Sequence, residues 1–320
     1  MQKILRQIGA VIRNIPAQLI LLVLLVFFAV RLKGMFFTVD NLIAIIRQVT
    51  TLGIAALGVS FLMITANLDF SIGSIYAFVG VFTAVMYNLG WNIYLAMFVS
   101  ILLGIALSVL TGWISITFKI PRLITSLAML TAISGLAVII SGNKTIYGLP
   151  DNIKWLGQGY IWIIPISTFI FVILAFLVAF ILNRTYLGRY LFAVGGNEDV
   201  ARLSGINANK IKYIASIISG FLASLAGLVA MSRTFSGSPF AGGSLSTDVI
   251  SAAVLGGVSI MGGTGKTSGL VTGIFIVGVL ATGLNMMNMN TNAQNIIKGL
   301  MLLVAVVLDS WTKRKAAAAK

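Results

Sequence analysis

The chain has 320 residues, of which 59% are hydrophobic and 9% are charged, with a mean hydropathy of +1.05. A chain of that length with so little polar surface cannot coat a soluble globule, which indicates an integral membrane protein. The sequence contains no cysteine and no histidine, which excludes disulfides, thiolate zinc sites and imidazole acid–base chemistry.

The first apolar run, Leu19 to Val30, follows three basic residues, as the apolar region of a signal peptide does. No small-residue cleavage pattern follows it, so we interpret it as an uncleaved first span. Further segments long enough to cross about 30 Å of hydrocarbon, at about 1.5 Å per residue, continue along the chain. The ten predicted spans are 17–33, 41–66, 71–88, 92–118, 123–141, 161–182, 211–231, 247–261, 268–286 and 293–310.

This pattern predicts an all-α membrane protein, a polytopic bundle of about ten transmembrane helices. Residues 1–320 then form a single transmembrane domain, without a soluble module that could hydrolyse a nucleotide. The hypothesis that spans two to five and seven to ten are inverted repeats rests on Asp69 and Asp248, which lie in corresponding loops on opposite membrane faces.

The basic residues indicate the orientation of the spans. An even number of spans puts both termini on one side, and the basic N-terminal segment and tail favour the cytoplasm. That orientation places 15 of the 22 Lys and Arg inside and 7 outside, as the positive-inside rule expects. Topology therefore explains the net charge, and no basic, aromatic-interleaved patch indicates a nucleic-acid partner. The inside residues are Lys3, Arg6, Arg13, Lys119, Arg122, Arg184, Arg189, Arg202, Lys210, Lys212, Lys266, Lys313, Arg314, Lys315 and Lys320.

The segment 184–212 is a polar island in this hydrophobic chain. Its charged residues would cost on the order of 20 kcal/mol in hydrocarbon, so it lies in water. We expect Gly195 and Gly196 to be flexible, and Asn197 to cap a short helix that ends near Gly205. Glu198, the single glutamate of the chain, is expected in the first turn, exposed and of little weight for folding. The stacked turn and cap signals favour a docking surface over a solvated loop without a partner.

The segment NLDFSIGS at 67–74 places Asp69 between two apolar runs. One interpretation is a turn in which Asp69 or Ser71 caps the next helix. The other is a broken helix whose polar end lines a path through the protein, and both can hold together. Polar groups within or bounding the apolar spans are the candidates for the translocation path, namely Asn67, Asp69, Ser71, Ser74, Thr247, Asp248 and Asn285.

The motif GGTGKT at 262–267 is similar to the end of a phosphate-binding loop. The glycine that such a loop needs five residues before Gly265 is replaced by Ile260, and no buried strand precedes it. ATP binding by this motif is therefore not expected. The small residues of 256–273 favour close packing of helices instead.

The sequence GRYLFAVGGNEDVARLSGI, within 184–212, resembles the cytoplasmic coupling loop of the permease subunits of ABC importers, in the ribose-type monosaccharide branch. The segments NLDFSIGS, TDVISAAVLGGVSIMGG and QNIIKGLMLLVAVVLD are similar to that branch in the same order, so the resemblance covers nearly the whole chain. The loop departs from the general EAA pattern of ABC permeases, because Asp199 and Val200 separate Glu198 from Ala201. The coupling residues that the resemblance implies are Arg189, Gly195, Gly196, Asn197, Glu198, Ala201 and Gly205.

The resemblance implies a permease subunit, with no catalytic site of its own, that imports a monosaccharide such as ribose across the bacterial cytoplasmic (inner) membrane. Its implied partners are ABC ATPase subunits, an extracytoplasmic sugar-binding protein, and a second permease copy or paralogue in the lipid bilayer. ATP and Mg are expected on the ATPase, and no cofactor or metal on this chain. Closure of the ATPase dimer would carry the 184–212 loops and switch the access of the path.

Alternatives remain for the substrate and for the class of transporter. A nucleoside or a signalling sugar derivative is an alternative substrate within the same family. A proton-coupled secondary transporter is less favoured, because Asp69 and Asp248 lie near span ends and no Glu or His lies within a span. A channel would leave the resemblance of the 184–212 segment to a docking loop unexplained.

Overall fold

The computed structural model of the chain describes residues 17–318, with side chains described up to residue 307. Within that part, nearly all regular structure is helical, apart from a small hairpin of β1 (Tyr160–Ile161) paired antiparallel with β2 (Ile164–Pro165). Lys3, Arg6, Arg13 and Lys320, which we predict on the cytoplasmic side, lie outside the described residues. The side chains of Lys313, Arg314 and Lys315 also lie outside the described part.

Each predicted span corresponds to a helix, which confirms the polytopic all-α fold. Among the described residues, six of these helices (α3, α5, α6, α8, α11 and α13) are long and apolar enough to cross a membrane, and the others are shorter apolar helices. The helices are α2 (Ala17–Leu32), α3 (Val39–Ile64), α4 (Ile72–Asn88), α5 (Ile93–Thr117), α6 (Arg122–Ser141), α8 (Ile166–Arg184), α11 (Ala208–Thr234), α12 (Leu245–Leu255), α13 (Thr267–Met286) and α14 (Thr291–Ala318).

The remaining helical segments are short and connect the spans. They are η1 (Met35–Phe37), η2 (Asp151–Ile153), α7 (Lys154–Gly157), α9 (Tyr186–Gly196) and α10 (Glu198–Leu203).

Two predicted spans differ from the helices at their boundaries. The span predicted at 247–261 ends earlier, because Gly256 closes α12 and Gly257 follows with φ +79°, a conformation that favours glycine. The span predicted at 161–182 starts later, because its first residues form the β1–β2 hairpin and Pro165 precedes the first turn of α8. Apolar content alone did not separate these turns from the helices beside them.

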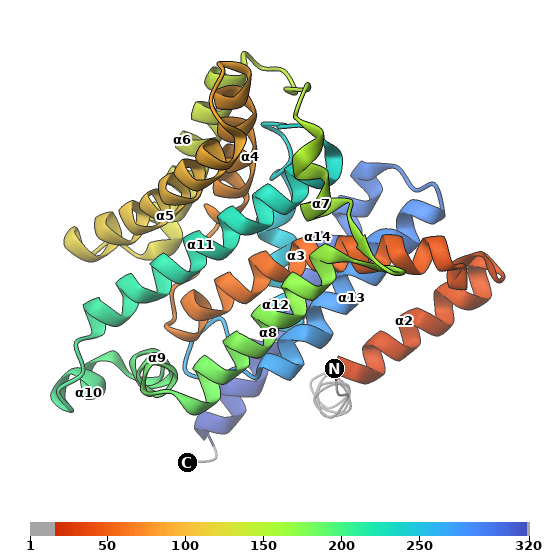
Figure 1. Ribbon diagram of the computed structural model, residues 1–320. Coiled ribbons are helices and arrows are strands. Elements are labelled where there is room, and N and C mark those ends of the chain that lie inside the picture. The colour runs from red at the N-terminus through yellow and green to blue at the C-terminus, as the bar shows by residue number, and fades with distance from the viewer. Residues whose placement is uncertain (1–16, 319–320) are drawn as a thin grey trace.

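Helices α3 and α11 cross the centre of the bundle (Figure 1), and together with α13 they are the most buried of the six long helices of the described part. They run antiparallel: Arg233 near the end of α11 lies beside Gln48 near the start of α3 and donates to it at 3.3 Å. Farther along, a Cβ on Gly58 would lie 3.0 Å from the Cβ of Leu222. Small residues therefore let the two central backbones approach closely.

The helices from α3 to α6 and from α11 to α14 pack in matching ways. In this correspondence α3 matches α11, α4 matches α12, α5 matches α13 and α6 matches α14. Helix α3 packs on α13, and in the same way α11 packs on α5. Helix α4 contacts α5, α6 and α11, while its counterpart α12 contacts α13, α14 and α3. This correspondence, with α3 and α11 antiparallel, is the arrangement that inverted repeats predict.

The N-terminal ends of α4 and α12, which we call their heads, meet each other. The Ser246 hydroxyl accepts from the main-chain N–H of Gly73 at 2.9 Å and donates to the carbonyl of Phe70 at 2.6 Å. A Cβ on Gly242 would overlap the carbonyl oxygen of Gly73. Both helices therefore begin in the interior, where close backbone contact joins the two halves of the fold.

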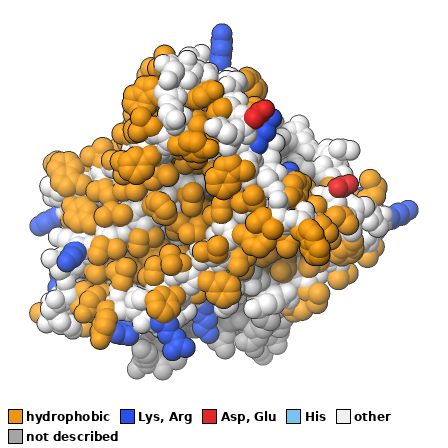
Figure 2. All heavy atoms as spheres, in the orientation of Figure 1, with side chains coloured by type: hydrophobic (Ala, Val, Ile, Leu, Met, Phe, Trp, Pro, Cys, Tyr) orange, Lys and Arg blue, Asp and Glu red, His pale blue; other side chains and the backbone are white. Residues whose placement is uncertain are grey.

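Hydrophobic side chains cover most of the face visible in Figure 2, and Lys and Arg side chains lie toward its rim. Helices α5 and α8 contribute exposed apolar residues such as Phe98 and Phe176, as expected for contact with lipid. The helices α9 and α10 lie together at one end of the bundle, which we call the α10 end (Figure 1). The opposite end carries α7, which bonds to the end of α11 through Gly157 and Ser232, followed by the β1–β2 hairpin, and we call it the α7 end (Figure 1).

Candidate functional site

The 184–212 segment folds into α9, α10 and the start of α11. Thr185 caps α9 by accepting from the N–H of Gly188, and Asn197 caps α10 by accepting from the N–H of Val200 at 3.1 Å. Helix α10 is followed by Gly205 at φ +82°. The predicted cap at Asn197 and the short helix that stops near Gly205 are confirmed.

The glycine pair Gly195–Gly196 ends α9 rather than forming the flexible turn that we expected. A Cβ on Gly195 would overlap the carbonyl oxygen of Ile64, the last residue of α3. The N–H of Gly263 donates to the same carbonyl at 2.9 Å, and a Cβ on Gly263 would lie 2.8 Å from the Cα of Gly196. The glycines of GGTGKT thus pack backbone against backbone, and they tie α9 to the end of α3.

The outward surface of the segment carries apolar side chains. Leu203 is 89% exposed, and Val200 lies one turn before it on α10, also exposed. Tyr186 on α9 is exposed, and the guanidinium of Arg189 stacks 4.3 Å from its ring centroid. The charges of this segment predict that it lies in water, where a group of exposed apolar residues favours contact with a partner.

Glu198 is engaged within the chain, which corrects the expectation of an exposed acid of little structural weight. Its carboxylate pairs with Lys212 at 2.6 Å and with Arg202 at 2.8 Å, and its side chain is 34% exposed. Arg202 also donates to Asn209 at 2.8 Å. Partial burial raises the pKa of Glu198, but the hydrogen bonds from Lys212 and Arg202 outweigh it and leave the pKa below its ordinary value. Glu198 therefore fastens α10 to the first turn of α11.

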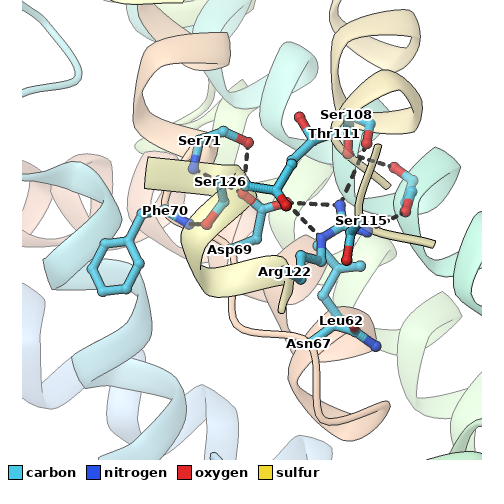
Figure 3. A network of polar contacts seen from close by, with 12 residues as sticks. Leu62, Asn67, Asp69, Phe70, Ser71, Ser108, Thr111, Ser115, Arg122 and Ser126 are labelled. Carbon is cyan, nitrogen blue, oxygen red and sulfur yellow. Dashed lines mark hydrogen bonds and ion pairs between the residues drawn. The ribbon is translucent and has the colours of Figure 1, made fainter. Parts of the chain in front are cut away.

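Above the α10 end, a buried cluster surrounds the head of α4 (Figure 3). Arg122, the first residue of α6, donates through Nη2 and Nε to Asp69 Oδ2 at 2.7 and 3.0 Å. The side chains of Arg122 and Asp69 are 2% and 0% exposed. An isolated charge at such a position would be strongly unfavourable, so each residue depends on the other.

Asp69 also orders the turn that leads into α4. Its Oδ1 accepts from the N–H of Ser71 at 2.8 Å and from the Ser71 hydroxyl at 2.6 Å. A negative charge beside a helix N-terminus is favourable for the helix dipole. Ser71 is the N-cap residue and makes no side-chain cap hydrogen bond, so the expected cap by Asp69 or Ser71 is not formed. The ion pair with Arg122 is a contact that the sequence did not reveal.

The other polar residues near Asp69 have different surroundings. Ser71 and Ser74 are buried, and the Ser74 hydroxyl donates to the carbonyl of Ser71 at 2.7 Å. Asn67 is half-buried and lines a cavity of about 880 Å³ at the α10 end. In this chain Asn67 reaches open space, whereas Asp69, Ser71 and Ser74 are enclosed.

The head of α12 carries a second ion pair. Lys298 of α14 donates to Asp248 Oδ2 at 2.7 Å, with side chains 13% and 7% exposed, and Ser244 donates to the same oxygen at 3.3 Å. Asp248 Oδ1 is buried without a hydrogen-bond partner among the described residues. Thr247, beside it, is exposed. This pair is the counterpart of Asp69–Arg122 in the second half of the fold.

Asn285 lies at the end of α13. It accepts from Gln294 at 2.8 Å and lines a cavity of about 580 Å³ at the α7 end, together with Arg47 and Arg233. Gln294 is one turn before Lys298 on α14, so Asn285 connects to the Asp248–Lys298 pair by way of that helix. The structure brings the candidates from Asn67 to Ser74 close to Thr247 and Asp248 through the joined helix heads.

Sequence reasoning missed Arg122 and Lys298 as members of these clusters. We assigned both residues to topology, one to each side of the membrane. The available signal was their position, because Arg122 immediately precedes a predicted span and Lys298 lies within one. A charge at such a position calls for a partner.

The geometry describes a polytopic membrane protein in which two short connecting helices, α9 and α10, are tied to the heads of two interior helices. Residues 41–306 match the family described as branched-chain amino acid transport system / permease component. The chain belongs to this family of permease components, and it is not itself an enzyme.

Curated relatives match along almost the whole chain. The ribose import permease protein RbsC of Haemophilus influenzae is 37% identical over 300 residues, which cover 92% of this chain and 93% of that protein. RbsC of Escherichia coli is 35% identical over 296 residues, covering 91% and 92%. The xylose transport system permease protein XylH of Escherichia coli is 30% identical over 357 aligned positions, covering 92% and 91%. No solved structure matches the chain. The resemblance to ABC sugar-importer permeases that the motifs indicated is confirmed.

Proposed function

We propose that this chain is the membrane-spanning permease subunit of an ATP-driven importer that carries a monosaccharide of the ribose type. Its relatives are named for ribose and xylose, which supports a pentose over the alternative nucleoside or signalling sugar derivative. The observation that carries the proposal is the 184–212 segment. It exposes Leu203 at its surface, while the backbone of Gly195 packs directly against Ile64 at the end of α3. Such a segment can receive a force from a partner and pass it to the bundle.

In this proposal the α10 end faces the cytoplasm and docks on the ATPase subunits, which bind ATP and Mg. The sugar-binding protein docks at the α7 end, and a second permease copy or paralogue completes the path. The basic residues at the α10 end, among them Lys119, Arg189 and Lys210, support this orientation through the positive-inside rule.

A proton-coupled transporter has less support from the geometry. Such a transporter usually needs a membrane acid that gains and loses a proton. Among the residues whose side chains are described, the buried acids Asp69 and Asp248 are both held by cations.

Replacing Leu203 with serine tests the docking surface directly. Because Leu203 is almost fully exposed, its replacement leaves the packing of this chain intact. Burial of a leucine in a partner is worth about 1.5–3 kcal/mol, so we expect the permease–ATPase affinity and sugar uptake in vesicles to fall tenfold or more. Leu89→Ser, at an exposed leucine of the α7 end, is the matched control and keeps wild-type ATPase binding. Equal behaviour of the two variants would contradict the proposal.

A further inference from the structure

An unbroken series of polar contacts joins α10 to the head of α4. Glu198 pairs with Lys212 Nζ at 2.6 Å, and the Lys212 carbonyl accepts from the Ser216 hydroxyl at 2.9 Å. Arg122 Nη1 donates to Ser216 Oγ at 2.6 Å, and Arg122 Nη2 donates to Asp69 Oδ2 at 2.7 Å. We call these five residues, Glu198, Lys212, Ser216, Arg122 and Asp69, the polar relay. It begins at the partly exposed Glu198 and ends at the fully buried Asp69.

Arg122 is the branch point of the polar relay. One edge of its guanidinium holds Asp69 through Nε and Nη2, while Nη1 holds Ser216 on α11. Nη2 also lies 3.4 Å from the carbonyl of Ser108 on α5. A planar guanidinium keeps these directions fixed relative to one another, which a lysine ammonium on a flexible stem does not. One side chain therefore fixes the relative positions of α5, α6, α11 and the head of α4 (Figure 3).

The contacts continue past Asp69 to the second half of the fold. Asp69 Oδ1 holds Ser71 at the start of α4. The Ser246 hydroxyl then joins Phe70 and Gly73 to α12. A displacement of the first turns of α11 would thus reach the heads of both interior helices through short, directional contacts.

The cavity at the α10 end gives α10 room to move. Its volume is about 880 Å³, with Glu198, Asp199 and Arg202 on one wall and Lys119, Pro121 and Arg122 on the other. Helix α10 therefore does not pack on the turn between α5 and α6 across this space. Among the described contacts, the path from Glu198 to Arg122 runs through Lys212 and Ser216 of α11.

We propose that Arg122 is a positioning residue that transmits movement of the 184–212 segment to the heads of α4 and α12. This inference rests on the proposed function, because it gives the docking segment a defined route to the translocation path. Arg122 does not touch the sugar in this role; it acts through Asp69 and Ser216.

The test separates transmission from simple stabilisation. The permease is purified with its ATPase and sugar-binding partners, reconstituted in lipid vesicles, and assayed for the number of sugars imported per ATP hydrolysed. Arg122→Lys keeps the positive charge opposite Asp69 and removes the second arm to Ser216. We expect normal abundance and basal ATP hydrolysis, but at least a tenfold drop in sugars per ATP. Arg31→Lys, the same change at an exposed arginine of α2 outside the 184–212 segment, is the matched control and keeps the wild-type ratio of sugars to ATP.

Ser216→Ala provides a second, milder interruption of the polar relay. It removes only the hydroxyl between Lys212 and Arg122, and we expect a drop of about threefold to fivefold in sugars per ATP. The double variant should be no worse than Arg122→Lys alone, because both changes interrupt one series of contacts. Independent structural defects would instead multiply.

Each outcome decides the inference. A wild-type ratio of sugars to ATP in Arg122→Lys would overturn it. If Arg122→Lys fails to accumulate, Ser216→Ala decides, and an unchanged ratio in that variant overturns the inference. A wild-type complex that imports no monosaccharide would contradict the proposed function itself and the relay with it, whereas a working wild type with unaffected variants contradicts the relay alone.

Discussion

The two buried ion pairs occupy matching places in the two halves of the fold but are built differently. Arg122 donates two N–H groups to Asp69 Oδ2, and Asp69 Oδ1 accepts from Ser71, so both carboxylate oxygens have hydrogen-bond partners. Lys298 meets Asp248 through one contact, and Asp248 Oδ1 has no partner among the described residues. The Asp69–Arg122 pair is fully enclosed, whereas the Asp248–Lys298 pair retains some exposure.

This difference indicates different mechanical roles. A fixed guanidinium with satisfied acceptors resists rotation of the elements around it, which suits a joint next to the 184–212 segment. A single ammonium contact with a spare acceptor opens at lower cost, because only one hydrogen bond on a flexible stem holds it. We therefore regard the Asp69–Arg122 pair as a rigid joint and the Asp248–Lys298 pair as a releasable contact.

The strongest test of this comparison is neutralisation of each aspartate. Asp69→Asn can still accept from Ser71 but leaves Arg122 buried without a counter-charge, and we expect a loss of about 3–5 kcal/mol in stability. Asp248→Asn should cost less, about 1–3 kcal/mol, because Lys298 makes a single contact with Asp248. Thermal unfolding of both purified variants, with uptake measured alongside, distinguishes them. Wild-type stability and uptake in Asp69→Asn would leave that residue only its contacts with Ser71.

Two adjacent glycines test how tightly the α10 end is assembled. A Cβ on Gly195 would overlap the carbonyl of Ile64, whereas a Cβ on Gly196 would meet nothing within 4 Å. We expect Gly195→Ala to cost about 1–3 kcal/mol and to uncouple uptake from ATP hydrolysis, and Gly196→Ala to behave as wild type. Both variants introduce the same side chain at neighbouring positions. Limited proteolysis of the 184–212 segment and uptake assays therefore compare the two variants directly. Similar results for both would mean that α9 does not need its contact with α3.

The smallest expected effect comes from making the second pair resemble the first. Lys298→Arg can donate to both oxygens of Asp248 and satisfy its unpartnered Oδ1, which we expect to raise stability by about 1 kcal/mol. If the pair opens during transport, the same change slows uptake severalfold. The thermal midpoint and the initial uptake rate measure the two effects. A gain in stability with an unchanged uptake rate would show that this pair stays closed throughout the cycle.

Much of the architecture could be predicted from the sequence because hydrophobic length dominates it. The ten apolar segments correspond to ten helices of the described part, and Asn197 and Gly205 delimit α10 through local chemistry that the sequence displays. The ends of α8 and α12 were misplaced, because a hairpin and a glycine turn there are as apolar as the helices.

The clusters at the helix heads could not be predicted in the same way. Asp69 and Arg122 are 53 residues apart, and their pairing follows from how α4, α5, α6 and α11 pack. Periodicity and composition do not contain that information. Glu198 was expected to be free, and its pairing with Lys212 on the next helix could not be predicted for the same reason. Its i,i+4 pairing with Arg202 was open to prediction from the spacing alone.

The shared hydroxyl of Ser246 has a consequence for how the molecule can be modified or can evolve. It serves α4 and α12 at once, and Gly73 and Gly242 touch beside it with no room for a side chain. The two halves are therefore not independent modules. A chimaera that joins residues 1–207 of this chain to the second half of a relative must preserve small residues on both sides of this seam, whatever sugar either parent carries.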